Sequence, residues 1–182
     1  MNHALITGGT GLFGSILVKA LIEGGYKVTF TSRTPEKAEK LIKDIGSSKA
    51  LDYKVANFSD ANSVENFVLD CDGAHFTHLI NNARTLDSLE VKNGLTSCDS
   101  TQEEFFMAVT LSYLLSMGFK QTLKAIVNIS SMYGVVPPNK NLYLDEYENS
   151  AIQYGVAKAA QIHLTKELAV RFASLNIRVN AI

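Results

Sequence analysis

The sequence has few cysteines, no long apolar run and no excess of positive charge, and each shortage excludes a class of protein. Its two cysteines, Cys71 and Cys98, lack a metal-type spacing and are too few for a disulfide framework, so reduced thiols are expected. No apolar run has membrane-spanning length and no leader precedes the first one, so a cytoplasmic chain without a membrane partner is expected. The 17 basic and 18 acidic residues form no basic stripe, so no nucleic-acid partner is expected.

The composition is that of one globular domain covering residues 1–182, with 46% hydrophobic residues to build a core. Apolar runs of strand type alternate with segments of helical periodicity, which predicts an α/β fold with a doubly wound parallel sheet and helices on both faces. Strands are predicted near residues 4–6, 27–31, 50–55, 79–80, 125–129 and 177–182. Helices are predicted near residues 14–23, 35–45, 60–69, 100–123 and 150–175.

Local signals suggest where some helices begin and which side they bury. Thr34 precedes Pro35 as an N-cap before a first-turn proline. Capping-box spacing is shown by Ser100 with Glu103 and by Ser150 with Gln153. The buried stripe of the first helix is predicted to be Ile16, Leu17, Ala20 and Leu21. Residues 84–99 and 132–149 are predicted loops near the mouth of the site, and the second is long enough to be a functional lid.

A glycine-rich turn, Thr7–Gly14, stands between the first predicted strand and the first predicted helix. Glycines in this context let the backbone approach a pyrophosphate, whose charge then lies at the helix N-terminus. The alternative is an ordinary flexible turn. We therefore predict a Rossmann-type dinucleotide site. The cofactor-binding residues predicted in the turn are Gly8, Thr10, Gly11, Leu12, Phe13 and Gly14.

A second set of polar residues lies near the last predicted helix. Tyr154 and Lys158 are four residues apart and therefore share a helix face, where an ammonium favours the ionised form of a phenol. Tyr154 is thus a candidate general acid/base, although such a pair alone is more often a solvated face. Ser131 follows a predicted strand at its carboxyl end, where open α/β sheets bind ligands, and its hydroxyl could donate to a substrate oxygen. Its other interpretation is a plain turn residue.

Together these residues make the sequence resemble a short-chain dehydrogenase/reductase. The motifs that carry the resemblance, in the right order along the whole chain, are TGGTGLFG at 7–14, NNA at 81–83, ISS at 129–131, YGVAK at 154–158 and IRVNAI at 177–182. The resemblance implies that Tyr154 is the catalytic acid/base, that Lys158 favours the phenolate and holds the nicotinamide ribose, and that Ser131 positions the substrate oxygen. Thr110 falls where the family usually has an asparagine that holds a proton-relay water.

The resemblance also implies further cofactor contacts. Those expected outside the glycine turn are Ser32, Arg33, Asn57, Phe58, Asn82 and Ala83, together with Tyr154 and Lys158. The second strand ends without the carboxylate that would repel a 2′-phosphate, and Arg33 can pair with that phosphate. NADP(H) is therefore favoured over NAD(H), unless Arg33 is merely a surface charge. No metal is expected, because His75 and His78 lack a third ligand.

Several positions depart from the family pattern. Leu12 stands where single-domain members usually have a glycine, Asn57 where an Asp is frequent, and Arg84 where a glycine usually follows NNA. The interval between Ser131 and Tyr154 is long, which is similar to members from bacterial surface-sugar and flagellin-modification pathways. The last strand of the family fold and its substrate-binding segment are missing, so the chain is expected to be either a piece of a longer protein or naturally short.

The main functional hypothesis is an oxidoreductase that transfers hydride between NADP(H) and a carbonyl/alcohol substrate, with a sugar derivative as one candidate small molecule. One alternative, suggested by Gly11 and Gly14, is an extended-type sugar-nucleotide epimerase or dehydratase. Another is a chain that binds a dinucleotide without catalysis. The apolar stripe of the long helix, Phe105, Phe106, Leu111, Leu114 and Leu115, fits internal packing or a partner subunit. By the resemblance, a homo-oligomer, dimer or tetramer, is expected.

Overall fold

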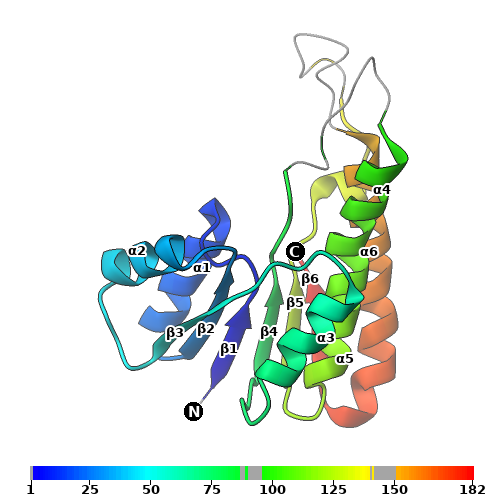
Figure 1. Cartoon of the computed structure of the whole chain (residues 1–182). Helices are drawn as coiled ribbons and strands as arrows, with labels where there is room; N and C mark the ends of the chain where they lie inside the picture. Colours follow the sequence, from blue (N-terminus) through cyan, green and yellow to red (C-terminus); the bar gives the residue numbers. More distant parts are fainter. Residues whose placement is uncertain (1, 87–88, 90–95, 140, 142–150) are drawn as a thin grey trace.

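The computed structural model describes residues 2–86, 89, 96–139, 141 and 151–182. This part of the chain forms a six-stranded sheet in the order β3-β2-β1-β4-β5-β6, and every neighbouring pair of strands is parallel (Figure 1). The strands are β1 His3–Ile6, β2 Lys27–Ser32, β3 Leu51–Val55, β4 His78–Asn81, β5 Ala125–Asn128 and β6 Arg178–Ala181. The predicted strand order along the chain is confirmed.

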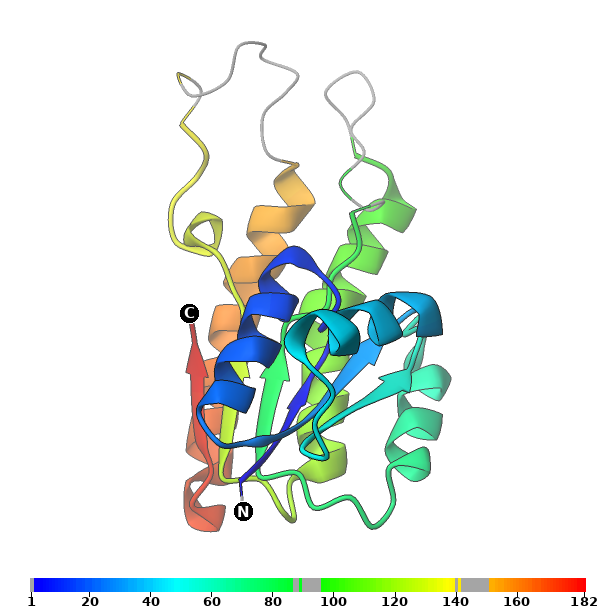
Figure 2. The ribbon, with the colours of Figure 1, turned by 90° about the vertical axis from the view of Figure 1, so that its left-hand side faces the viewer.

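Helices lie on both faces of this sheet, which confirms the doubly wound α/β prediction. Figures 1 and 2 show α1 and α2 on one face, and α3, α5 and α6 on the other. The α-helices are α1 Leu12–Glu23, α2 Pro35–Ile45, α3 Ala61–Asp70, α4 Cys98–Phe105, α5 Leu111–Phe119 and α6 Ile152–Phe172. A π-helical turn, η2 (Phe106–Thr110), joins α4 to α5, and short 3-10 turns form η3 (Met132–Gly134) and η5 (Ala173–Leu175).

The core has two apolar layers because successive side chains of a strand point to opposite faces. In β1, Leu5 belongs to the layer under α3, α5 and α6, whereas Ala4 and Ile6 belong to the layer under α1 and α2. Strands covered on both faces need apolar residues at consecutive positions, which explains the unbroken apolar run Ala4–Ile6. The strand order reverses between β1 and β4. In open α/β sheets, ligands bind outside the carboxyl ends of the strands at such a reversal.

The predicted buried face of α1 is wrong for two of its residues. Ile16 is 58% exposed and Ala20 is exposed, whereas Gly14 and Val18 are buried. The helix begins at Leu12, with Gly11 as its N-cap, and it must turn Gly14 toward the glycine loop. A β-carbon at Gly14 would collide with the Gly8 carbonyl oxygen. This close contact sets the rotation of the helix, and periodicity alone does not reveal it.

Two predicted helix starts are also corrected. The helix predicted to be capped by Ser100 begins at Cys98. Its N-cap is Ser97, three residues before the predicted cap, and the Ser97 hydroxyl accepts from the Ser100 amide. The predicted single helix is interrupted by η2 and ends at Phe119. The cap of α6 is Ala151, whose backbone begins the helix without a side-chain bond, and Ser150 lies outside the described residues. Thr34 is the N-cap of α2, although its side chain makes no capping bond.

Candidate active site

The glycine turn is held at the carboxyl edge by the residues that follow β4. The Asn82 side-chain amide donates to the carbonyl oxygens of Thr7 (3.0 Å) and Gly8 (3.1 Å). The backbone amides of Asn82 and Ala83 both donate to the buried Thr7 hydroxyl, at 3.0 and 2.9 Å. These four bonds join the two loops that flank the reversal of strand order. The structure thus brings the NNA motif and the glycine turn together.

Two glycines of the turn are needed for close backbone approach. Gly8 has φ of +67°, and a β-carbon there would lie 2.9 Å from the Ala83 Cα. Gly14 packs directly on the Gly8 carbonyl. The side chains of Leu12 and Phe13 point to solvent beside the helix start, with Leu12 89% exposed. The turn is therefore a tight backbone cradle with an open rim, which fits a dinucleotide pyrophosphate.

The end of β2 forms the next wall of the candidate cofactor site. Its Thr31 hydroxyl accepts from the Gly8 amide at 2.9 Å, and Ser32, which is buried, lies 3.3 Å from the Thr10 hydroxyl. Arg33 follows immediately and is exposed. Ser32 is bonded to the glycine turn, so the backbone of Arg33, the next residue, lies close to that turn.

The two residues predicted after β3 differ in exposure. Asn57 is exposed, as a cofactor contact requires. The ring of Phe58 is buried in the core and meets the Phe67 ring edge-on, with 5.2 Å between the ring centroids. A cofactor contact from Phe58 would therefore have to come from its backbone.

Ser131 lies at the carboxyl end of β5, where it caps η3. Its hydroxyl accepts from the Tyr133 amide at 3.2 Å, and the neighbouring Ser130 hydroxyl donates to the Lys158 carbonyl oxygen at 3.1 Å. Gly134 of η3 packs so closely on α6 that a β-carbon would lie 2.8 Å from the Lys158 carbonyl carbon. The segment that carries Ser131 is therefore fixed to the helix that carries Tyr154 and Lys158.

Two cations lie close to the Tyr154 ring. The Lys158 Nζ is 5.8 Å from the centroid of the Tyr154 ring, and the Arg84 Cζ is 4.5 Å from it. Both distances are within the range of a cation–π contact. Arg84 comes from the loop after β4, so sequence distance conceals this contact. The sequence singled out Arg84 only as a departure from the family glycine.

Lys158 is the most perturbed cation of the site. Its residue is only 6% exposed, and this burial lowers the pKa of its ammonium to about 8. Glu104 from α4 opposes that change, whereas Arg84 adds to it. A lysine whose pKa is lowered by burial, next to a phenol, is a candidate functional residue.

Thr110 differs in exposure from the buried Lys158. Thr110 ends η2 and is exposed. The polar group that Lys158 does contact is Gln161, whose Oε1 accepts from the ammonium at 3.1 Å. The sequence analysis missed Gln161. Its position one turn after Lys158 was the available signal, but Gln153 and Thr165 are also buried polar residues of α6, so nothing local distinguished Gln161.

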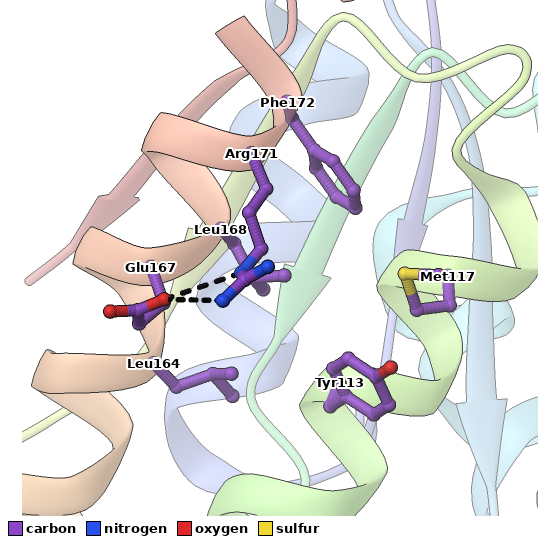
Figure 3. A pocket seen from close by; sticks show the side chains of 7 residues that line it. All are labelled: Tyr113, Met117, Leu164, Glu167, Leu168, Arg171 and Phe172. Carbon is purple, nitrogen blue, oxygen red and sulfur yellow. Dashed lines mark hydrogen bonds and ion pairs between the residues drawn. The ribbon is translucent and has the colours of Figure 1, made fainter.

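A separate apolar groove lies between α5 and α6, away from the carboxyl edge. Figure 3 shows Tyr113 and Met117 from α5 facing Leu164 and Leu168 from α6. The Glu167 carboxylate accepts from the Arg171 guanidinium at 3.0 Å along the rim. The groove encloses about 670 Å³. It contains none of the predicted catalytic residues.

The described residues contain neither a candidate membrane span nor a candidate metal site. None of their helices is both long and apolar enough to cross a membrane. Over the same ranges, no three His, Cys, Asp or Glu side chains gather as a candidate metal site. Both cysteines are free, with Cys71 buried and Cys98 exposed.

Comparison with protein families places the chain. The family model for short chain dehydrogenases matches residues 2–182, so the chain belongs to the short-chain dehydrogenase/reductase family. An uncharacterized oxidoreductase, UxuB, of Bacillus subtilis is 29% identical, and the match covers 98% of this chain and 68% of the relative. Galactitol 2-dehydrogenase of Rhizobium johnstonii is also 29% identical, over 100% of this chain and 70% of the relative.

Solved structures have the same fold. A short chain dehydrogenase from Leptospira borgpetersenii with bound NAD+ is 26% identical, with a TM-score of 0.82 over 99% of this chain and 69% of that one. The Pseudomonas aeruginosa RhlG/NADP complex is 21% identical, with a TM-score of 0.84 over 99% of this chain and 70% of that one. The family match and the oxidoreductase relatives, not the shared fold, show that the protein is an NAD(P)-dependent dehydrogenase/reductase. The comparisons give no support to the epimerase or dehydratase alternative, or to a non-catalytic chain.

Proposed function

We propose that the protein reduces a carbonyl group, or oxidises the corresponding alcohol, with NADP(H), and that Tyr154, Lys158 and Ser131 carry the chemistry. The observation that supports this most directly is the buried Lys158 ammonium beside the Tyr154 ring, at the carboxyl edge of β5. A cation held there stabilises a phenolate, and a phenol that can ionise reversibly is a general acid/base.

The chain's own residues then divide the work of carbonyl reduction. The Tyr154 hydroxyl donates its proton to the substrate oxygen, and the phenolate that remains is stabilised by Lys158. Ser131 donates a hydrogen bond to the same oxygen as its negative charge develops. The nicotinamide, when bound, supplies the hydride. The glycine cradle, braced by the Asn82 bonds, would hold the dinucleotide. The nicotinamide and the Tyr154 hydroxyl would then act on the same substrate.

The cofactor and the substrate are proposed more finely from the rim of the site. The exposed Arg33 beside the turn supports NADP(H), because its guanidinium can pair with a 2′-phosphate. The contacts assigned to Gly11, Asn57 and Ala83 complete the proposed dinucleotide site. A sugar or polyol substrate is supported by the similarity to galactitol 2-dehydrogenase.

We further propose that the enzyme is cytoplasmic and forms a homo-oligomer, in which a second copy covers the α5–α6 groove. The apolar walls of the groove, from Tyr113 to Leu168, support such a contact, since water leaves apolar surface favourably. Light scattering of the wild type and of Met117→Lys tests the assembly. A monomeric wild type would contradict this proposal.

Turnover by Tyr154→Phe tests the chemistry. NADP+ with galactitol is the first probe, followed by other polyols and their ketones. The variant should lose at least about 10³-fold in kcat, because the proton donor is gone, while its NADP+ affinity by calorimetry stays close to that of the wild type. Tyr53→Phe, which removes a phenol hydroxyl that donates to Glu39, is the matched control and should keep full activity. Retained turnover in Tyr154→Phe would rule out the acid/base role.

A further inference from the structure

The Lys158 ammonium makes two hydrogen bonds within the described part of the chain, and neither is to Tyr154. One goes to the Ile129 carbonyl oxygen at the end of β5, at 2.8 Å. The other goes to Gln161 Oε1 at 3.1 Å. Gln161 lies one helical turn after Lys158 on α6, and its side chain is buried with 2% exposure. An ammonium has three donors, so this arrangement leaves one for the site.

The orientation of the Gln161 amide is chemically determined. An ammonium only donates, so the amide oxygen must face Lys158 and the amide nitrogen must face the other way. That nitrogen donates to the Ser112 hydroxyl at 3.2 Å. The Ser112 hydroxyl in turn donates to the Ala108 carbonyl oxygen at 2.9 Å. A directed chain of hydrogen bonds thus leads from Lys158 on α6 to the π-helical turn η2.

We propose that Gln161 is a positioning residue that holds the Lys158 ammonium at the end of β5, and that Ser112 holds the Gln161 amide in the required orientation. The inference rests on the proposed function of Lys158. It differs from the expectation for Thr110, whose exposed side chain lies outside this chain of bonds. The side-chain hydrogen bond that holds the Lys158 ammonium therefore comes from Gln161 on the same helix.

An amide suits this position better than an acid or an apolar residue. A carboxylate would pair with the ammonium and cancel the charge that a phenolate needs, whereas an apolar side chain would leave a buried donor unsatisfied. The other charged or titratable groups that face Lys158 are Glu104 from α4, Arg84 from the loop after β4, and Tyr154 on α6. Gln161 holds the ammonium among them without changing the net charge.

Two substitutions of Gln161 should change Lys158 in opposite directions. Gln161→Met keeps the length of the side chain but removes the acceptor, so the pKa of Lys158 should fall by about one unit. Gln161→Glu adds a carboxylate, so that pKa should rise by about one unit or more. The measurement is an NMR titration of the Lys158 side-chain methylene next to the nitrogen, in the whole chain. An unchanged pKa of Lys158 in both variants would overturn the proposal.

A matched control separates positioning from packing. Thr165→Val acts one turn further along α6, where the Thr165 hydroxyl donates to the Gln161 backbone carbonyl at 2.8 Å and has no bond to Lys158. It should leave the pKa of Lys158 unchanged. Ser112→Ala keeps Gln161 but frees its amide, and it should lower that pKa by less than Gln161→Met does. Ser112→Ala also replaces the Gln161 variants if they fail to fold. An unchanged pKa of Lys158 in Ser112→Ala would then overturn the proposal.

The pH dependence of alcohol oxidation gives a second readout. In Gln161→Met the rising limb of the kcat profile should move to higher pH by about one unit, because a weaker cation favours the phenolate less. The NMR titration needs no turnover. A chain that shows the predicted shifts of Lys158 but no hydride transfer would count against the proposed function alone.

Discussion

The Arg84 guanidinium lies over the Tyr154 ring, with its central carbon 4.5 Å from the ring centroid. Arg84 belongs to the loop after β4, and Tyr154 belongs to the first turn of α6. The contact therefore joins the two sides of the candidate active site. It also places a second positive charge, besides that of Lys158, near the phenol that we assign as the acid/base.

Removal of the Arg84 guanidinium should weaken catalysis modestly. A cation–π contact at an exposed site stabilises by about 0.5–1 kcal/mol, which corresponds to a two- to five-fold change in rate if the contact acts in the transition state. Arg84→Ala should therefore lower kcat by about that factor. Arg84→Lys keeps the positive charge, so its kcat should fall less than that of Arg84→Ala. Steady-state kinetics of the three proteins measure the effect, and equal kcat values would show that the contact does not orient Tyr154.

Arg33 is predicted to select the phosphorylated cofactor. Arg33→Ala should bind NADP+ about ten-fold more weakly, because it loses a charge-assisted contact with the 2′-phosphate, and should bind NAD+ as the wild type does. Lys37→Ala removes another exposed cation, one turn into α2, and controls for general charge. Calorimetric titration with both cofactors decides the point. Equal affinities for NADP+ and NAD+ in the wild type and in Arg33→Ala would contradict the preference.

Asn82 is predicted to support both stability and cofactor binding. Asn82→Ala loses the two bonds to the carbonyl oxygens of Thr7 and Gly8, so the free energy of unfolding should fall by about 1–2 kcal/mol. The dinucleotide affinity should fall as well, because the glycine cradle keeps only the backbone bonds that join Thr7 to the segment after β4. Asn62→Ala, on the exposed side of α3, is the control. Urea unfolding and cofactor titration are the measurements, and a variant with unchanged affinity would argue against the clamp.

Lys158 should make stability depend on pH in the alkaline range. Burial lowers its pKa from 10.5 to about 8 in the folded protein, so between these values the unfolded chain binds more protons than the folded one. Stability from this group therefore rises as the pH goes from about 8 to about 10.5, by up to about 3 kcal/mol. Urea unfolding at several pH values should show this rise relative to Lys158→Met. A constant difference between the two proteins would contradict the lowered pKa.

Much of the fold and part of the candidate site follow from local sequence. Apolar runs such as Ala4–Ile6 predict buried parallel strands, because a strand covered on both faces has no polar side. The glycine turn and the Tyr154/Lys158 spacing predict a dinucleotide site and an acid/base pair, because backbone approach and helical spacing depend on neighbours in the chain. The same residues predicted the family and the enzyme class.

Only the tertiary structure decided which residues meet across the elements. Periodicity predicted Ile16 as buried, but the contact of Gly14 with Gly8 rotates α1 and exposes it. Lys158 bonds to Gln161, the Gln161 amide bonds in turn to Ser112, and Arg84 lies over the Tyr154 ring. Ser112 and Arg84 are more than forty residues of chain away from these α6 residues. Their pairing depends on how α5, α6 and the loop after β4 pack around the sheet. Local sequence carries helix and strand preferences, whereas burial and long-range hydrogen bonds arise only when these elements are brought together.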